Sequence, residues 1–199
     1  MNIFVLNENP QLAAQQMCDK HIVKMPVETA QMLSTVHRML DGHPYVDTGK
    51  SGRKIKRWRH TTDLSFSSGP LLYHATMMNH PCTIWARETL GNYRWLVDHG
   101  LALCKEYTRR YGRIHGSWRV IHYCDYNDPK NINPSEKTTE FPQAMPIHLK
   151  VSGDAVSAYR QYYIEEKARF ATWKSPAEMP DWFFQGISSS GLTDVPMSV

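Results

Sequence analysis

Residues 19–38 read DKHIVKMPVETAQMLSTVHR, and this stretch decides how the rest of the chain is organised. Its polar side chains recur at steps of three and four residues, so they share one face of a single helix. That face consists of His21, Lys24, Glu28, Gln31, Thr35 and Arg38, opposite an apolar side of Ile22, Pro26, Val27, Ala30, Leu33 and Val36. A solvated helix face usually holds mostly Lys and Glu, whereas this one adds an imidazole, an amide and a hydroxyl. The pattern is compatible with a functional site and with a solvated face that carries one incidental histidine.

The helix is expected to extend beyond this stretch, over residues 10–40. Pro26 lies inside it and has no backbone N–H, so we expect a kink or a break near residues 22–25. Such a bend would fall between His21 and Glu28 and could tilt both side chains toward a common point.

The composition is typical of one globular domain. Hydrophobic residues make up 41% of the 199 residues and charged residues 21%, which excludes a largely disordered chain. The formal net charge of +4 is mildly basic, so it is compatible with a nucleic-acid partner without requiring one. The helical periods predict an all-α fold, a compact domain of three to four helices with long loops. We expect this domain to span residues 1–184 and residues 185–199 to form a flexible tail.

The first six residues, MNIFVL, are too apolar to lie in water. We expect them to form an extended segment that threads between the helices. Asn7 and Glu8 end the apolar run and no basic residue precedes it, which argues against a signal peptide. No apolar run approaches the roughly 20 residues that span a bilayer, so we expect no membrane partner. The four cysteines lie far apart without a CxxC pair, and we expect reduced thiols in a cytoplasmic protein.

Further helical periods appear later in the chain, over residues 80–111 and over residues 155–173. Residues 118–124 are apolar and fit either a strand or a helical turn. Residues 125–147 are rich in Pro, Asn, Ser and Thr, and this composition predicts a long loop.

A basic stretch, residues 50–59 (KSGRKIKRWR), holds six cations within an irregular region over residues 43–79. A flexible loop of this kind could contact phosphates through Arg57, with Trp58 stacking on a base. A solvated surface loop explains the composition equally well.

The spacing Asp19-x-His21 followed by Glu28 resembles the phage pyrimidine-dimer DNA glycosylases, the UV endonuclease V family. Two later features are similar to the same family in the same order. His80 opens an aromatic helical segment, and residues 166–173 carry an EK…TW pattern. The segments MNIFVL, CDKHIVK and NHPCTIWARE also resemble uncharacterised tailed-phage proteins, which suggests a bacteriophage source and the host cytoplasm.

The resemblance implies a compact helical fold with a threaded N-terminal segment, and it implies a mechanism. An N-terminal α-amine, on Met1 or Asn2, attacks C1′ of the damaged nucleotide, and Glu28 stabilises the positive charge that develops on the sugar. His21 and Arg38 would position sugar and phosphate. The resemblance also implies DNA contacts through Lys167 and Trp173, and His80 is a further candidate because it begins the similar aromatic segment. The helix face adds Lys24 and Gln31 as candidates for substrate or DNA contacts, the basic stretch adds Arg57 and Trp58, and the aromatic C-terminal helix adds Arg160 and Tyr163.

The function predicted in this way is a DNA glycosylase, with or without AP-lyase activity, that acts on a damaged or modified pyrimidine in duplex DNA. An alternative is a protein that binds or hydrolyses a free nucleotide on the same fold. A third hypothesis is a metal-dependent hydrolase with His21, Glu28 and His37 as ligands. No HExxH motif and no Cys/His pair with zinc-ligand spacing occurs, so the prediction includes neither a metal nor another cofactor.

Overall fold

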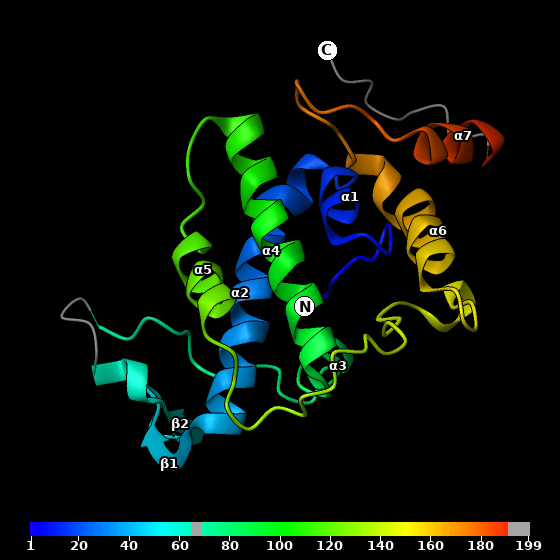
Figure 1. The fold of residues 1–199 in the computed structure, drawn as a ribbon. Coiled ribbons are helices and arrows are strands. Elements are labelled where there is room, and N and C mark those ends of the chain that lie inside the picture. The colour runs from blue at the N-terminus through cyan, green and yellow to red at the C-terminus, as the bar shows by residue number, and fades with distance from the viewer. Residues whose placement is uncertain (65–68, 191–199) are drawn as a thin grey trace.

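The computed structural model describes residues 1–64 and 69–190 (Figure 1). These residues form a mostly helical fold with one small antiparallel sheet, so the all-α prediction misses a β-hairpin. The helices are α1 (Pro10–Gln15), α2 (Asp19–Asp41), α3 (Pro81–Ala86), α4 (Leu90–Tyr111), α5 (Trp118–Tyr126), α6 (Ala155–Lys167) and α7 (Asp181–Ser190). The strands are β1 (His43–Thr48) and β2 (Lys54–Arg59), and short 3₁₀ helices cover Thr61–Leu64, Ile147–Leu149 and Ala168–Phe170.

The two long helices, α2 and α4, pack against each other and form the centre of the molecule (Figure 1). Gly100 permits their close approach, because a Cβ atom there would lie 2.7 Å from the Cγ2 atom of Thr29. α1 and α5 also pack on α4, while α6 and α7 pack together beyond the N-terminal segment (Figure 1). Among the described residues, no helix is both long and apolar enough to cross a membrane. All four cysteines are free and buried.

The first predicted helix is broken earlier than expected. Residues 10–40 form two helices, and the break lies at residues 16–18, whereas α2 continues through Pro26. At the start of α2, the backbone N–H of Asp19 donates to the carbonyl of Thr172 at 2.8 Å. A partner from the far end of the chain therefore satisfies this helix end, which no local sequence pattern could indicate.

Most of the basic stretch, Lys54–Arg59, is a β-strand, and its first four residues lie in the turn that precedes this strand. β2 pairs antiparallel with β1, with a register from Thr48 opposite Lys54 to His43 opposite Arg59. Gly52 lies in the connecting turn with a φ of +76°, which glycine adopts without strain. Strand pairing fixes the positions of the cations on the hairpin. The sequence analysis missed this hairpin because the high charge of the stretch resembles that of a solvated loop.

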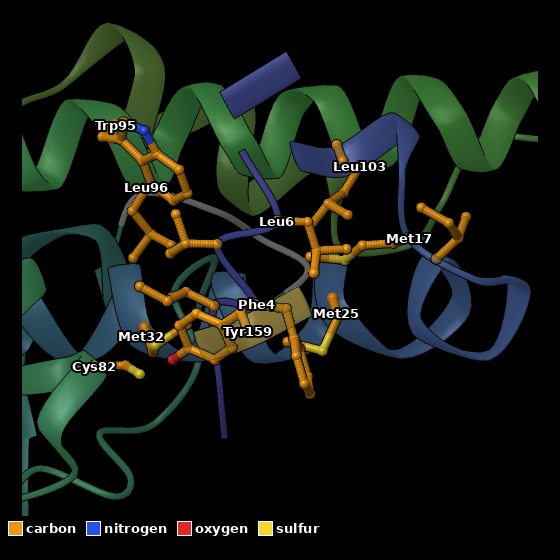
Figure 2. Close-up of a cluster of buried hydrophobic side chains, with 14 of the residues drawn as sticks. Phe4, Leu6, Met17, Met25, Met32, Cys82, Trp95, Leu96, Leu103 and Tyr159 are labelled. Atoms are coloured by element: carbon orange, nitrogen blue, oxygen red, sulfur yellow. The ribbon is translucent and has the colours of Figure 1, made fainter. Parts of the chain in front are cut away.

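The N-terminal segment threads through the core as predicted. Ile3, Val5 and Leu6 are fully buried, and Figure 2 shows Phe4 and Leu6 among side chains of the surrounding helices. The backbone carbonyl of Leu6 accepts a hydrogen bond from Nε of Arg160 at 3.0 Å. This contact joins the segment to α6.

The C-terminal elements differ from the prediction in their bounds. α6 ends at Lys167 and is followed by a 3₁₀ turn, so the predicted helix over residues 155–173 is too long. Residues 118–124, which fit either a strand or a helical turn, belong to helix α5. α7 continues to Ser190, beyond the predicted domain limit at residue 184, and residues 191–199 of the predicted tail lie outside the described residues.

The predicted loop over residues 125–147 closes over the beginning of α4. The backbone N–H groups of Leu90 and Gly91 donate to the carbonyls of Asn133 and Ser135, each at 2.9 Å. The loop carbonyls therefore satisfy donors that have no partner inside the helix. A Cβ atom on Gly91 would lie 2.3 Å from the carbonyl oxygen of Glu136, so the loop backbone rests directly on this glycine.

Gly91→Ala should therefore destabilise the fold. A methyl group at this position displaces the loop backbone, and we expect the free energy of unfolding to fall by about 1–3 kcal/mol. Urea denaturation followed by circular dichroism measures the change. Gly116→Ala is the matched control, because no atom lies within 4 Å of a Cβ at Gly116; equal losses in both variants would contradict the close contact.

Candidate active site

A cavity of about 430 Å³ lies between the N-terminal segment, the first half of α2 and the end of α6. It brings together residues that are far apart in the sequence. The lining residues are Met1, Asn2, Phe4, Lys20, His21, Lys24, Met25, Glu28, Ala144, Tyr162, Lys167 and Phe170. Six of the predicted site residues, Met1, Asn2, His21, Lys24, Glu28 and Lys167, are among them.

The carboxylate of Glu28 contacts the first two residues of the chain. Its Oε2 atom accepts a hydrogen bond from the backbone N–H of Asn2 at 2.9 Å and lies 3.6 Å from the α-amine of Met1. Its Oε1 atom lies 3.0 Å from Nζ of Lys24, one helical turn earlier. The Glu28 side chain is only 11% exposed, while that of Lys24 is 69% exposed. A shielded carboxylate, a primary amine and a solvent-accessible cation therefore meet at one point.

The side chain of Asn2 fixes the backbone that presents this amine. Its Oδ1 atom accepts from the N–H groups of Ile3 and Phe4, at 2.7 and 3.1 Å. Its Nδ2 atom donates to the carbonyl of Ala144 at 2.9 Å. Every polar atom of the amide thus has a partner, and the first residues are held in one conformation.

His21 is a buried, neutral member of the site. Its Nδ1 atom is hydrogen-bonded to the hydroxyl of Tyr163, and its ring stacks on Phe4 with the ring centroids 4.3 Å apart. Burial, with the nearby charges of Lys167 and Lys24, lowers the pKa of His21 to about 3. The imidazole therefore acts at neutral pH as a positioning group or a hydrogen-bonding group without a charge.

Aromatic side chains that the sequence analysis did not select line the cavity. Phe4 lies between His21 and Tyr162, whose ring is nearly parallel to that of Phe4 at 5.9 Å. Phe4 has a φ of +42°, a strained conformation for a residue with a bulky side chain, which such residues keep mainly where tertiary contacts impose it. The apolar N-terminal segment signalled burial of Phe4, but only the fold shows that its ring borders the site.

Three lysines give the cavity a positive rim. Lys20, Lys24 and Lys167 line it, and Glu28 is the single carboxylate among the lining residues. Nζ of Lys167 donates to the hydroxyl of Tyr162 at 3.1 Å, and Nζ of Lys20 lies 4.6 Å from the ring centre of Phe170. This arrangement suits an anionic ligand with a planar group, such as a nucleotide.

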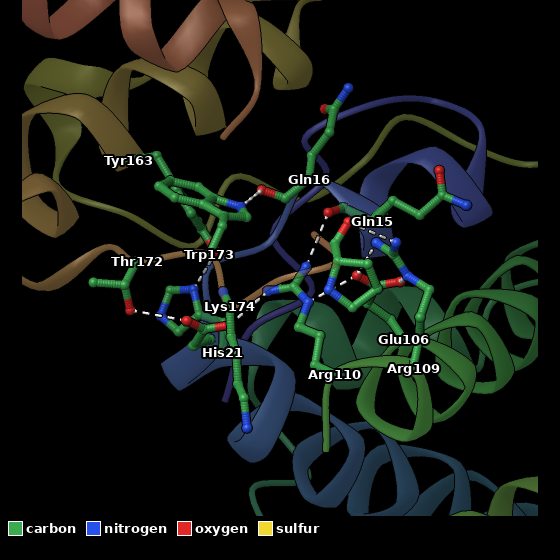
Figure 3. A network of polar contacts seen from close by, with 12 residues as sticks. Gln15, Gln16, His21, Glu106, Arg109, Arg110, Tyr163, Thr172, Trp173 and Lys174 are labelled. Carbon is green, nitrogen blue, oxygen red and sulfur yellow. Dashed lines mark hydrogen bonds and ion pairs between the residues drawn. The ribbon is translucent and has the colours of Figure 1, made fainter. Parts of the chain in front are cut away.

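A buried polar network holds α2 at the site. Asp19 accepts from a guanidinium NH of Arg110 at 3.0 Å, from the Thr172 hydroxyl at 2.9 Å and from the Lys174 N–H at 3.0 Å. Figure 3 shows Arg110 at the centre of this network, where its Nε also donates to Glu106 at 2.7 Å. The Asp19 of the Asp-x-His spacing is therefore a structural anchor, two residues before His21.

Arg38 does not reach the cavity, in contrast to its predicted contact with phosphate. Its side chain is buried and donates five hydrogen bonds, to both carboxylate oxygens of Asp63 and to the carbonyls of Trp58, Leu72 and Tyr73. All donors of the guanidinium are used within the protein. Arg38 thus joins α2 to the hairpin and to the segments that follow it.

Four other predicted contact residues are engaged in packing or ion pairs. Tyr163 and Trp173 are almost fully buried, and Trp173 donates to the carbonyl of Gln16 at 3.2 Å.

The other two residues lie on the hairpin. Trp58 is 9% exposed and lies beneath the ammonium group of Lys56, so its ring is not available to stack on a base in this conformation. Arg57, on the same strand, pairs with Asp47 at 2.7 Å.

The remaining predicted contacts lie outside the residues that line the cavity. Gln31 is half-buried one turn after Glu28. His80 caps α3 by accepting from the N–H of Cys82 at 3.2 Å. The pKa of His80 is lowered, by burial and by the α-amine of Met1, while Glu28 opposes this shift. The charges at the start of the chain and on Glu28 therefore act on this histidine. Arg160 anchors the N-terminal segment as described above.

The proposed ligand set of His21, Glu28 and His37 is wrong. Nε2 of His37 is hydrogen-bonded to the hydroxyl of Tyr93 at 2.7 Å, and its nearest metal-ligating neighbours are Asp41 and His60. Within the described ranges, His21 and Glu28 belong to no cluster that could hold a metal ion. The two ends of α2 carry separate groups of polar residues.

The N-terminal half of this arrangement corresponds to a known family. A family model described as pyrimidine dimer DNA glycosylase matches residues 1–120. The chain belongs to this family. No curated protein and no solved structure matches the chain. The match includes Met1, His21 and Glu28, whereas Tyr162, Lys167 and Phe170 on the other side of the cavity lie beyond the matched residues. The resemblance of residues 166–173 to this glycosylase family therefore stays a prediction.

The low pKa of His21 predicts a pH dependence of stability. The unfolded chain takes up a proton on this imidazole below about pH 6.5, whereas the folded chain does so only near pH 3. Between these values the unfolded state binds more protons, so the unfolding free energy falls as the pH is lowered, by up to about 1.4 kcal/mol per unit. In His21→Gln this slope should be smaller, as measured by denaturation at pH 7, 6 and 5. Other buried histidines contribute equally to both proteins, so identical slopes would contradict the assignment.

The role of Arg38 predicts a loss of stability without a direct effect on ligand contacts. Arg38→Met leaves Asp63 and three carbonyls without their donor, and we expect the unfolding free energy to fall by about 3–5 kcal/mol. Arg57→Met removes a partly exposed pair near the surface and should cost less than about 1 kcal/mol. Denaturation curves of both variants test this difference. A larger loss of stability in Arg57→Met than in Arg38→Met would contradict it.

Proposed function

We propose that the protein is a DNA glycosylase that removes a damaged or modified pyrimidine from duplex DNA, with an α-amine at the start of the chain as its nucleophile. The observation that carries this proposal is the contact between Glu28 and the first two backbone nitrogens inside the cavity. Membership of the pyrimidine dimer DNA glycosylase family supports the substrate class. The further activity as an AP lyase and the choice of nucleophile belong to the proposal.

Either of two amines fits the geometry. With Met1 present, its α-amine lies 3.6 Å from Oε2 of Glu28. If Met1 is removed, the nitrogen of Asn2 becomes the α-amine, and it lies 2.9 Å from the same oxygen. Because the hydrogen bonds of the Asn2 side chain hold this backbone in place, both amines would meet a sugar at the same point in the cavity.

In the proposed reaction the amine nitrogen forms a bond to C1′ while the bond from C1′ to the base breaks. The base leaves with that electron pair and takes up a proton. The adduct opens to an imine, and loss of a proton from C2′ with departure of the 3′-phosphate cuts the strand. Glu28 would stabilise the positive charge that develops at C1′ and would accept a proton from the attacking amine.

The cations around the cavity support a DNA substrate. Lys20, Lys24 and Lys167 would contact the phosphates on either side of an extruded nucleotide. Extrusion costs a few kcal/mol and least for a damaged pair, which favours lesions over intact DNA. The exposed lysines and arginines of the hairpin would add backbone contacts that do not depend on sequence, and in this proposal Trp58 stays packed.

Glu28→Gln separates chemistry from binding. The variant keeps the size of the side chain and one hydrogen-bond acceptor but loses the charge, so we expect turnover to fall at least about a hundredfold. The affinity for damaged duplex should change only a few-fold, because the lysines remain. Base release is measured on duplexes that contain a modified pyrimidine, and strand cleavage and borohydride trapping are measured on these and on duplexes that contain an abasic site or a cyclobutane thymine dimer.

The matched control is Glu166→Gln, which removes the same charge from an exposed position on α6. This variant should form the borohydride-trapped adduct and turn over substrate at the same rate as the unmodified protein. Mass mapping of the adduct should place the attached DNA on residue 1 or residue 2. A folded Glu28→Gln variant with full activity would refute the role of Glu28. If no duplex yields free base or adduct while free nucleotides bind in the cavity, the nucleotide-binding alternative replaces the glycosylase.

A further inference from the structure

The C-terminal end of α2 carries a second group of polar side chains, separate from the residues that line the cavity. His37 and Asp41 lie one helical turn apart, and His60 directly follows β2. One potential ligand atom from each of these residues lies within 4.8 Å of the other two. This is the one group of three or more His, Cys, Asp or Glu residues within the described parts of the chain that could hold a metal ion.

The hydrogen bonds of His37 determine which ring nitrogen is free. Its Nε2 atom lies 2.7 Å from the hydroxyl of Tyr93, and that hydroxyl also faces the carbonyls of Cys124 and Asn127 at 3.1 and 3.3 Å. Carbonyls only accept, so the hydroxyl proton goes to a carbonyl in the tautomer of His37 in which Nε2 donates to the Tyr93 hydroxyl. In this tautomer the Nδ1 atom of His37 carries a lone pair, as a metal ligand requires.

The other two side chains are also held by their neighbours. Nδ1 of His60 lies 2.9 Å from the hydroxyl of Thr62 and accepts from the Thr62 backbone N–H at 3.3 Å, so Nε2 is the nitrogen that faces away from these partners. For Nε2 to bind a metal, the ring proton must move to Nδ1, where it would be donated to the Thr62 hydroxyl. The carboxylate of Asp41 accepts from the backbone N–H groups of Lys130 and Asn131 at 2.8 and 3.0 Å. Oδ1 of Asp41 also accepts from Nδ2 of Asn131 at 3.0 Å, so Oδ2, which accepts a single hydrogen bond, is the oxygen that retains a lone pair for a metal. Asp41 is half-buried while the histidines are buried, so an ion would enter from the side of Asp41.

We propose that His37, Asp41 and His60 bind a divalent first-row transition metal ion such as Zn²⁺, with water completing the coordination. Two imidazoles and one carboxylate form a donor set that such ions prefer, and Tyr93 and Thr62 would orient the imidazoles through their outer nitrogens. Bonds of about 2.1 Å in a tetrahedral site separate the ligand atoms by about 3.4 Å, so the side chains would close by about an ångström on binding.

The ion would join three segments of the chain. His37 and Asp41 belong to α2, His60 stands at the base of the hairpin, and the backbone that holds Asp41 belongs to residues 130–131. The site lies outside the cavity that holds Glu28, because none of its ligands lines that cavity. Its role would be to fix the hairpin on the helical body, so it is independent of the proposed glycosylase chemistry.

The test is a titration of the full chain with Zn²⁺ after dialysis against a chelator. Isothermal calorimetry should show one ion per chain, and the bound ion should raise the thermal unfolding temperature. Asp41→Asn and His60→Gln should each weaken binding at least about tenfold. His148→Ala, at an exposed histidine on the 3₁₀ helix Ile147–Leu149, should bind like the unmodified protein. All four cysteines are buried, so they do not compete for the ion in the folded chain.

A second measurement does not depend on any variant that might fail to fold. In the unmodified protein, histidine NMR signals of His37 and His60 should shift on addition of Zn²⁺, while that of His148 should not. Signals of His37 and His60 that stay unchanged at saturating Zn²⁺ would overturn the proposal. Binding that persists undiminished in both folded ligand variants, or a dissociation constant weaker than about 1 mM, would overturn it as well.

Discussion

A carboxylate inside the fold holds the beginning of the chain, and the site depends on this contact. The first six residues are extended and largely buried, so their backbone polar groups must find partners within the protein. Glu28, the Asn2 side chain and Arg160 supply them. The same arrangement directs the first two backbone nitrogens at a carboxylate in a cavity. The same contacts therefore bury the segment and present an amine to the cavity. Phe4, whose backbone is strained, lies within this segment.

Helix α2 uses one polar face for two different tasks. Its first half directs His21, Lys24 and Glu28 toward the cavity, and its last turns direct Arg38 toward the hairpin. This explains why a face rich in polar groups is mostly buried, while Val23 and Val27 on the other side are exposed. Buried polar side chains need fixed partners, so the helix is held in register at both ends.

Much of the local structure could be predicted from the sequence, because its causes are local. Asn9 before Pro10 starts α1, Asp154 caps α6, and Gly112 ends α4 in a left-handed conformation. The family resemblance that pointed to Met1, His21 and Glu28 selected residues that meet in space. The role of Arg38 could not be predicted, because its partners come from residues 58–73 and a helix face does not reveal them. The hairpin was missed for a related reason: its stability comes from pairing between strands, and its cations resemble those of a solvated loop.

The two sides of the cavity come from different parts of the chain. The side with the amine and Glu28 lies within the residues that match the glycosylase family, whereas Tyr162, Lys167 and Phe170 come from α6 and the turn that follows it. The second side consists of rings and a cation, which define the shape and charge of the space without taking part in bond breaking in the proposed mechanism. In the proposed mechanism, substitutions there would change which base fits while the contact between Glu28 and the N-terminus stays intact. The proposed chemistry and the choice of substrate are therefore separable in this fold.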